Sequence, residues 1–221
     1  HGMNDAGHGV RDRHTDFAFA RSAHETLAEK DIPHVFLQQP GGHSVGYSKA
    51  LILEFLQQDP DLRRDPFSPH IAIASPVGYR ESASYPLHHN RWLTLDAATE
   101  GMLEFDALKS NGKGHRKDST LDEWNAWQLT RMKVKQPGAM VEAVNKGDNL
   151  IEVTTSNVAR FTVWLHPRMV DLSKVVRVTV NGEPRYEGKI ESSLGTALES
   201  FERRRDWGLV YPAKITLDLK P

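Results

Sequence analysis

The 221-residue chain lacks several features that would each point to a class of function. It has no cysteine, which excludes disulfides, thiolate nucleophiles and cysteine-based zinc sites. No apolar run approaches 18 residues, so we expect no segment that spans a membrane. The formal net charge is −1, which gives no general reason to bind nucleic acid or an anionic membrane surface.

The residues that are present indicate an ordinary globular chain, with 38% hydrophobic and 26% charged residues. The 11 histidines are more than usual. His8, His14, His24 and His34 could form a metal cluster with His1, but they lack the helical i, i+4 pairing and the companion carboxylate of a metal motif. We interpret them as surface or loop residues and expect neither a metal nor another cofactor.

The first 58 residues are predicted to form a helix, a strand and a second helix. Apolar residues recur at helical spacing over residues 15–30 and again over 47–58, and the run 33–37 is short and apolar. Residues 59–70 carry three prolines and five charges, a composition typical of a linker. The sequence therefore predicts one segment over residues 1–58, followed by a linker.

Residues 71–221 are predicted to form an antiparallel β-sandwich. Short apolar runs alternate with turn residues, and the pair Asn181-Gly182 indicates a tight hairpin because both positions favour positive φ. A short helix is expected near residues 198–205. The predicted fold class is α+β, with a partial α/β-hydrolase segment (helix-strand-helix) followed by this sandwich. The expected strands cover residues 71–74, 92–95, 102–108, 127–134, 140–143, 150–155, 161–165, 175–180, 186–190 and 215–219.

Two short motifs carry the candidate chemistry. Asp5 ends an H-G-x-x-D pattern that begins at His1, and His43 follows two glycines. One predicted helix and one predicted strand lie between them, so a parallel sheet would bring both residues to loops at its carboxyl edge. An aspartate that fixes the tautomer of a histidine lets that histidine take a proton from a nucleophile and return it to a leaving group. The spacing therefore predicts an acid and a base of one catalytic triad.

Together these motifs resemble the last third of an α/β-hydrolase, of the prolyl oligopeptidase-like and related serine esterase type. The resemblance covers about residues 1–58. In that family the triad order is serine, acid, histidine, which implies that Asp5 is the acid and His43 the base. The nucleophile elbow and the oxyanion loop of the family would lie upstream of His1. The resemblance thus implies a serine hydrolase that transfers acyl groups to water and whose nucleophilic serine lies outside this chain.

Two other interpretations remain open. Gly42-His43-Ser44-Val45-Gly46 matches G-x-S-x-G, so Ser44 could itself be the nucleophile of a lipase-type elbow. The loop residues 38–41 argue against it, because an elbow turns sharply out of an apolar strand. Alternatively, Asp5 and His43 are a turn acid and a loop histidine without catalytic roles. The β-rich part would then make the protein a binding or structural module.

The partners follow from the hydrolase interpretation. Met3 could be an initiator behind two residues of a tag, but we favour His1 as an internal residue because it begins the H-G-x-x-D pattern. The nucleophile would then come from an upstream part of the same hydrolase or from a companion chain, and the substrate would be an ester or a peptide. A secreted or periplasmic location follows only if a signal peptide precedes His1.

Overall fold

The computed structural model describes residues 17–32, 34, 36, 49–58, 65–76, 88–110 and 129–219. Contacts divide the chain into two compact units. We call residues 1–64 with 105–134 the helical unit, and residues 65–104 with 135–221 the two-sheet unit. Asp5, His43 and Ser44 lie outside the described residues.

The described part of the helical unit contains two of the predicted helices, α1 (Phe17–Glu29) and α2 (Lys49–Gln58). Asp31 adopts the left-handed conformation with φ 51° directly after α1. The amide of Asp31 donates to the carbonyl of Ala28, and the amide of Ile32 donates to that of Leu27. This pair of bonds is a Schellman motif, which satisfies two carbonyls at the end of the helix.

The strand expected between these helices is not present in the described residues. Ile32, His34 and Phe36 have no strand conformation. Their side chains make local contacts instead. His34 bonds the carbonyl of Ile32 through Nδ1 at 2.7 Å, and the His24 ring of α1 stacks on Phe36 at 4.5 Å. A short apolar run can pack along a neighbouring helix as well as enter a sheet, and the two described residues of the run 33–37 are not in the predicted strand.

The predicted fold class is therefore wrong as well. Strands account for 50% of the structure and helices for 21%, and the three described helices are accompanied by two sheets. The fold is β-rich, and the described residues show no helix-strand-helix α/β-hydrolase segment. None of the described helices has both the length and the apolar character needed to cross a bilayer.

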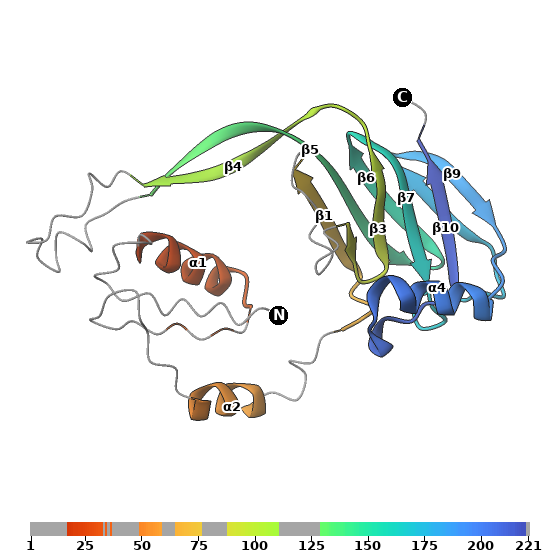
Figure 1. Ribbon diagram of the computed structural model, residues 1–221, viewed down its shortest axis with the longest axis horizontal. Coiled ribbons are helices and arrows are strands. Elements are labelled where there is room, and N and C mark those ends of the chain that lie inside the picture. Colours follow the sequence, from red (N-terminus) through yellow and green to blue (C-terminus); the bar gives the residue numbers. More distant parts are fainter. Residues whose placement is uncertain are drawn as a thin grey trace, which may run out of the picture. The chain divides into compact units, whose positions relative to one another are not determined.

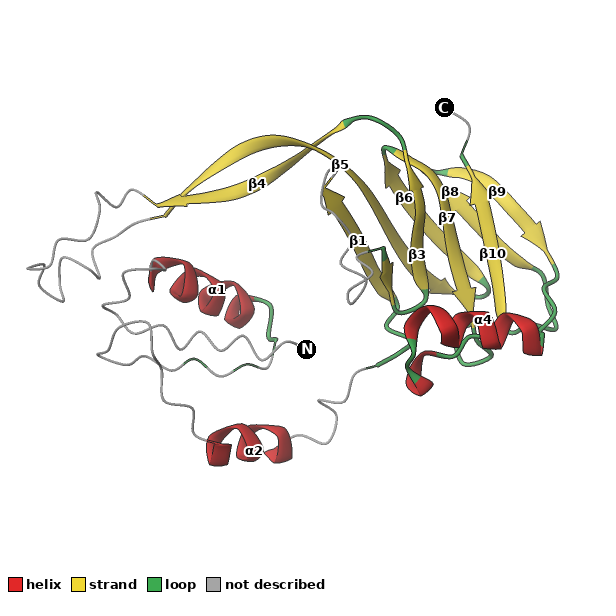
Figure 2. Ribbon diagram, in the orientation of Figure 1, coloured by secondary structure: helices red, strands yellow, loops and turns green. Residues whose placement is uncertain are grey.

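The first sheet is mixed (Figures 1 and 2). Its strands belong to the two-sheet unit, except for residues 105–110 of β4 and 129–134 of β5, which belong to the helical unit. Its strand order is β1-β5-β6-β8-β9, and β4 also pairs with β5. The pairs β1–β5, β5–β6 and β8–β9 are antiparallel, whereas β6 and β8 are parallel. The prediction of an antiparallel sandwich is wrong for this pair, because the chain leaves the sheet after β6, forms β7 in the second sheet and returns as β8 in the same direction as β6. The strands are β1 (His70–Pro76), β4 (Met102–Ser110), β5 (Leu129–Gly147), β6 (Leu150–Ser156), β8 (Val176–Val180) and β9 (Glu183–Gly188).

The second sheet has the order β10-β7-β3-β2 and is antiparallel throughout. Buried residues of both sheets form one hydrophobic cluster, so the sheets pack against each other. On β8, buried Val176, Val178 and Val180 alternate with Arg177 and Thr179, as expected for a strand with one face in the core. The strands are β2 (His89–Asn90), β3 (Leu93–Ala98), β7 (Val158–Leu165) and β10 (Ala213–Asp218).

Two local predictions in this unit are confirmed. Asn181 and Gly182 connect β8 and β9 with φ values of 52° and 86°, as a two-residue hairpin turn requires. A helix is present near the predicted residues 198–205, as α4 (Leu194–Arg204), followed by the short 3₁₀ helix η2 (Trp207–Leu209). Ser193 caps α4 by accepting a hydrogen bond from the amide of Thr196 at 3.0 Å.

Candidate functional site

The structure brings two of the predicted loop histidines together. His24 Nδ1 and His34 Nε2 are 2.6 Å apart. Because His34 Nδ1 faces the carbonyl of Ile32, that nitrogen carries the proton, and Nε2 accepts from His24. Within the described ranges, no group of three or more histidine, aspartate or glutamate side chains could hold a metal ion. The pair is a hydrogen-bonded contact between the middle of α1 and a residue that follows this helix.

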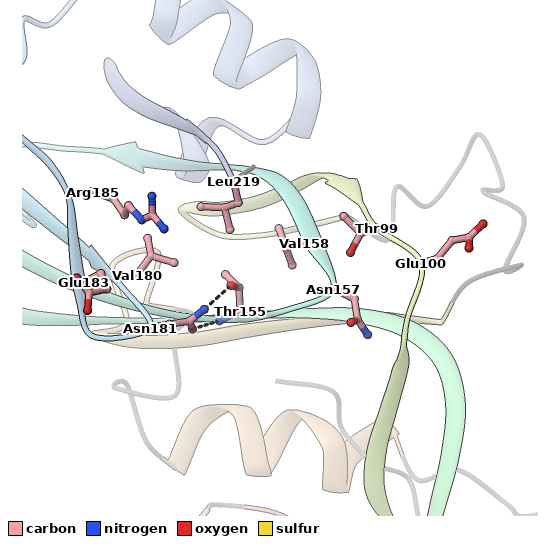
Figure 3. Close-up of a pocket in the computed structure, with 10 residues that line it drawn as sticks. All are labelled: Thr99, Glu100, Thr155, Asn157, Val158, Val180, Asn181, Glu183, Arg185 and Leu219. Atoms are coloured by element: carbon pink, nitrogen blue, oxygen red, sulfur yellow. Dashed lines mark hydrogen bonds between the residues drawn. The ribbon is translucent and has the colours of Figure 1, made fainter. Parts of the chain in front are cut away.

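A pocket of about 460 Å³ lies within the two-sheet unit (Figure 3). Its walls come from the β3–β4, β6–β7 and β8–β9 connections and from the end of β10. Buried Val158 and Val180 supply apolar surface, together with half-buried Leu219. The lining residues are Thr99, Glu100, Thr155, Asn157, Val158, Val180, Asn181, Glu183, Arg185 and Leu219.

Two asparagines in the pocket wall are held in fixed orientations. Asn181 accepts from the amide of Thr155 at 2.9 Å and donates to its hydroxyl at 3.1 Å. Asn157 donates to the carbonyl of Gly138 at 2.8 Å. The Asn157 side chain also lies against Gly101, where an added Cβ would be 2.1 Å from Asn157 Oδ1. The pocket wall is thus ordered by its own hydrogen bonds.

A second polar cluster lies where α4 meets the four-stranded sheet. The guanidinium of Arg204 lies 4.7 Å from the ring centre of Trp164 and 5.2 Å from that of Tyr211. It donates to the carbonyls of Arg91 and Ser200. Burial lowers the pKa of Arg204 to about 10, so this side chain stays charged at neutral pH. The cluster anchors α4 through cation–π contacts and hydrogen bonds.

His166 lies in a packed environment that favours its neutral form. Its ring stacks on Phe67 at 4.7 Å, and its Nδ1 accepts the amide proton of Arg168 at 3.1 Å. Burial, and secondly the charge of Arg168, lower the pKa of His166 below 6.5. Protonation at Nδ1 would break the bond from Arg168.

The pKa of His89 on β2 is also lowered. Burial lowers its pKa, and the charges of Arg204, Arg203 and His88 lower it further. Both histidines are therefore held neutral in the folded protein at a pH where the unfolded chain binds protons.

We expect the free energy of unfolding to fall as the pH drops below about 6.5, because the unfolded chain then binds more protons than the folded one. The loss continues until the pH passes below the folded pKa values. Denaturant unfolding at pH 7.5 and at pH 5.5 measures this difference. The double variant His89→Gln, His166→Gln should show a smaller difference than the wild type, and an equal difference would refute the assignment.

Comparison with known protein families, curated proteins and solved structures finds no match. The pocket was not predicted from the sequence, which identified Asn181 only as a turn residue. Thr99, Asn157 and Arg185 carry no motif that would have indicated a shared site.

Proposed function

We propose that this chain is part of a serine hydrolase that transfers acyl groups from an ester or a peptide to water. Asp5 is the triad acid and His43 the triad base. The observation that carries the proposal is the pair of motifs, H-G-x-x-D before α1 and Gly41-Gly42-His43 before α2. The two helices predicted to follow these motifs in the chain, α1 and α2, are present in the structure. The motif pair resembles that of prolyl oligopeptidase-like hydrolases.

The proposed mechanism follows the triad residue by residue. His43 removes the proton from a serine hydroxyl supplied by the upstream part of the hydrolase or by a companion chain, and the serine oxygen attacks the carbonyl carbon. Asp5 stabilises the resulting imidazolium. His43 then gives its proton to the departing alkoxide or amine. Water, deprotonated by the same histidine, releases the acyl group.

The lipase-type interpretation of Ser44 has less support. A nucleophile elbow follows directly from a strand. Among the residues that the structure describes between α1 and α2, none is in a strand. The relay through Asp5 and His43 does not require a strand that ends directly at Gly42.

A second candidate function is a binding module without catalysis. The observation that favours it is the ordered pocket of the two-sheet unit, which has a volume typical of small-molecule sites. In the first candidate function the acting residues are Asp5 and His43, whereas in the second they line the pocket of the two-sheet unit.

Hydrolysis of a p-nitrophenyl ester and of a peptide anilide by the intact gene product tests the proposal. We expect hydrolysis of at least one substrate, and its loss in His43→Ala. The matched control is His70→Ala, because His70 is an exposed histidine on β1. Equal activity in His43→Ala and His70→Ala would refute the role of His43. No hydrolysis of either substrate would favour the binding module.

A further inference from the structure

The pocket of the two-sheet unit contains a cation whose position is set by an irregularity of strand β9. Val178 pairs with Tyr186, but the next residue on β8, Thr179, pairs with Pro184. Arg185 is therefore the extra residue of a β-bulge. Bulges redirect side chains and are frequent beside binding sites. Arg185 lines the pocket, and Figure 3 shows its side chain reaching toward Leu219.

The side chains of Arg185 and Glu183 are exposed and have no charged partner among the described residues. In the described part of the chain, neither side chain forms an ion pair or a hydrogen bond, although the two residues lie on one strand and line one pocket. Glu100 is a third charged lining residue, but its carboxylate points away from the other lining side chains in Figure 3. The pocket thus offers one positive and one negative group to a ligand.

Apolar surface completes the site. Val158 and Val180 are 7% and 3% exposed, so their positions are fixed by the core. Together with Leu219 they form a face that suits an aliphatic group. The amide of Asn181 is held by Thr155 and retains one N–H for a ligand.

We propose that this pocket binds an α-amino acid with an aliphatic side chain. The Arg185 guanidinium pairs with the ligand carboxylate, the Glu183 carboxylate pairs with the ammonium group, and the apolar face receives the side chain. A ligand with only one charge would leave Arg185 or Glu183 without a partner. The site does not depend on acyl transfer, so it would bind its ligand even if the chain had no hydrolase activity.

Titration of the 221-residue chain with three probes of similar shape tests the proposal. Leucine carries both charges, 4-methylpentanoate lacks the ammonium group and 3-methylbutylamine lacks the carboxylate. We expect leucine to shift the amide resonances of Thr155 and Asn181, and each singly charged probe to bind about tenfold or more weakly. A 4-methylpentanoate affinity equal to that of leucine, or no binding of leucine, would overturn the proposal.

Two variants locate the binding groups. Arg185→Gln should weaken leucine binding about tenfold to a hundredfold, as expected for loss of a charge-assisted hydrogen bond. Glu183→Gln should weaken leucine binding and leave 4-methylpentanoate binding unchanged. The matched control is Arg177→Gln, which removes an exposed arginine of neighbouring β8 outside the pocket. If Arg185→Gln binds leucine as Arg177→Gln does, while its other amide resonances remain those of the folded protein, the assignment is wrong.

Discussion

Replacing Asp5 with asparagine is expected, under the proposed hydrolase function, to lower kcat of the intact protein by about 10⁴-fold, with a much smaller change in KM. An asparagine keeps the size of the side chain but favours the wrong tautomer of the catalytic histidine and cannot stabilise the imidazolium. A loss confined to kcat indicates an interaction made in the transition state. Steady-state kinetics on the ester or the anilide measure both constants.

Asp31 supplies the matched control for this prediction. It is also an aspartate of the helical unit, but it ends α1 through its left-handed backbone conformation. Asn is well tolerated in that conformation, so Asp31→Asn should keep kcat within about twofold. If Asp5→Asn also keeps kcat within that range, Asp5 is not the triad acid.

The second large effect is expected on stability, at Trp164. This side chain is 1% exposed, and its Nε1 donates to the hydroxyl of Thr94 at 2.8 Å. Arg204 and Lys214 lie over its ring at 4.7 and 5.3 Å. Trp164→Ala should lower the free energy of unfolding by about 3–5 kcal/mol, because it opens a cavity and removes the ring that Arg203, Arg204 and Lys214 lie over. Denaturant unfolding measures this change.

Trp164→Phe separates the ring from the hydrogen bond. Phenylalanine retains an aromatic face for Arg204 but lacks the indole N–H donor that Thr94 accepts. We expect the loss in the free energy of unfolding to be less than half as large in Trp164→Phe as in Trp164→Ala. Equal losses in the two variants would mean that the hydrogen bond, and not the packed ring, holds this part of the sheet.

The features that the sequence predicted well depend on local patterns. The apolar spacing within residues 15–30 and 47–58 is a property of each helix alone, and α1 and α2 form within those ranges. The alternation over Val176–Val180 likewise specifies a strand with one buried face. The Asn181-Gly182 turn follows from the backbone preferences of two residues.

Features that depend on distant partners were not predicted. The expected strands over 127–134 and 140–143 are one strand, β5 (Leu129–Gly147), which continues through Pro137. A proline usually marks the end of a strand because it cannot donate a hydrogen bond. In β5, the residues paired with β1 begin at Gly138, and those paired with β6 begin at Met140. Pro137 precedes both paired stretches, so neither β1 nor β6 requires a hydrogen bond from its backbone nitrogen.

The candidate sites also differ in whether they depend on local patterns or on distant partners. Asp5 and His43 could be selected from the sequence because each belongs to a short motif. The pocket residues could not, since Thr99, Asn157 and Arg185 come from connections far apart in the chain and meet only through the order of the strands. The bulge that places Arg185 depends on the register of β8 with β9, which no local pattern encodes.

Identification of the residue that reacts with a fluorophosphonate tests the central claim most directly. The intact protein, with its upstream part or companion chain, is treated with the probe, digested and analysed by mass spectrometry. The proposed relay predicts that the modified residue is a serine outside these 221 residues and that the modification is lost in His43→Ala. Modification of Ser44, or modification that persists in His43→Ala, would contradict it.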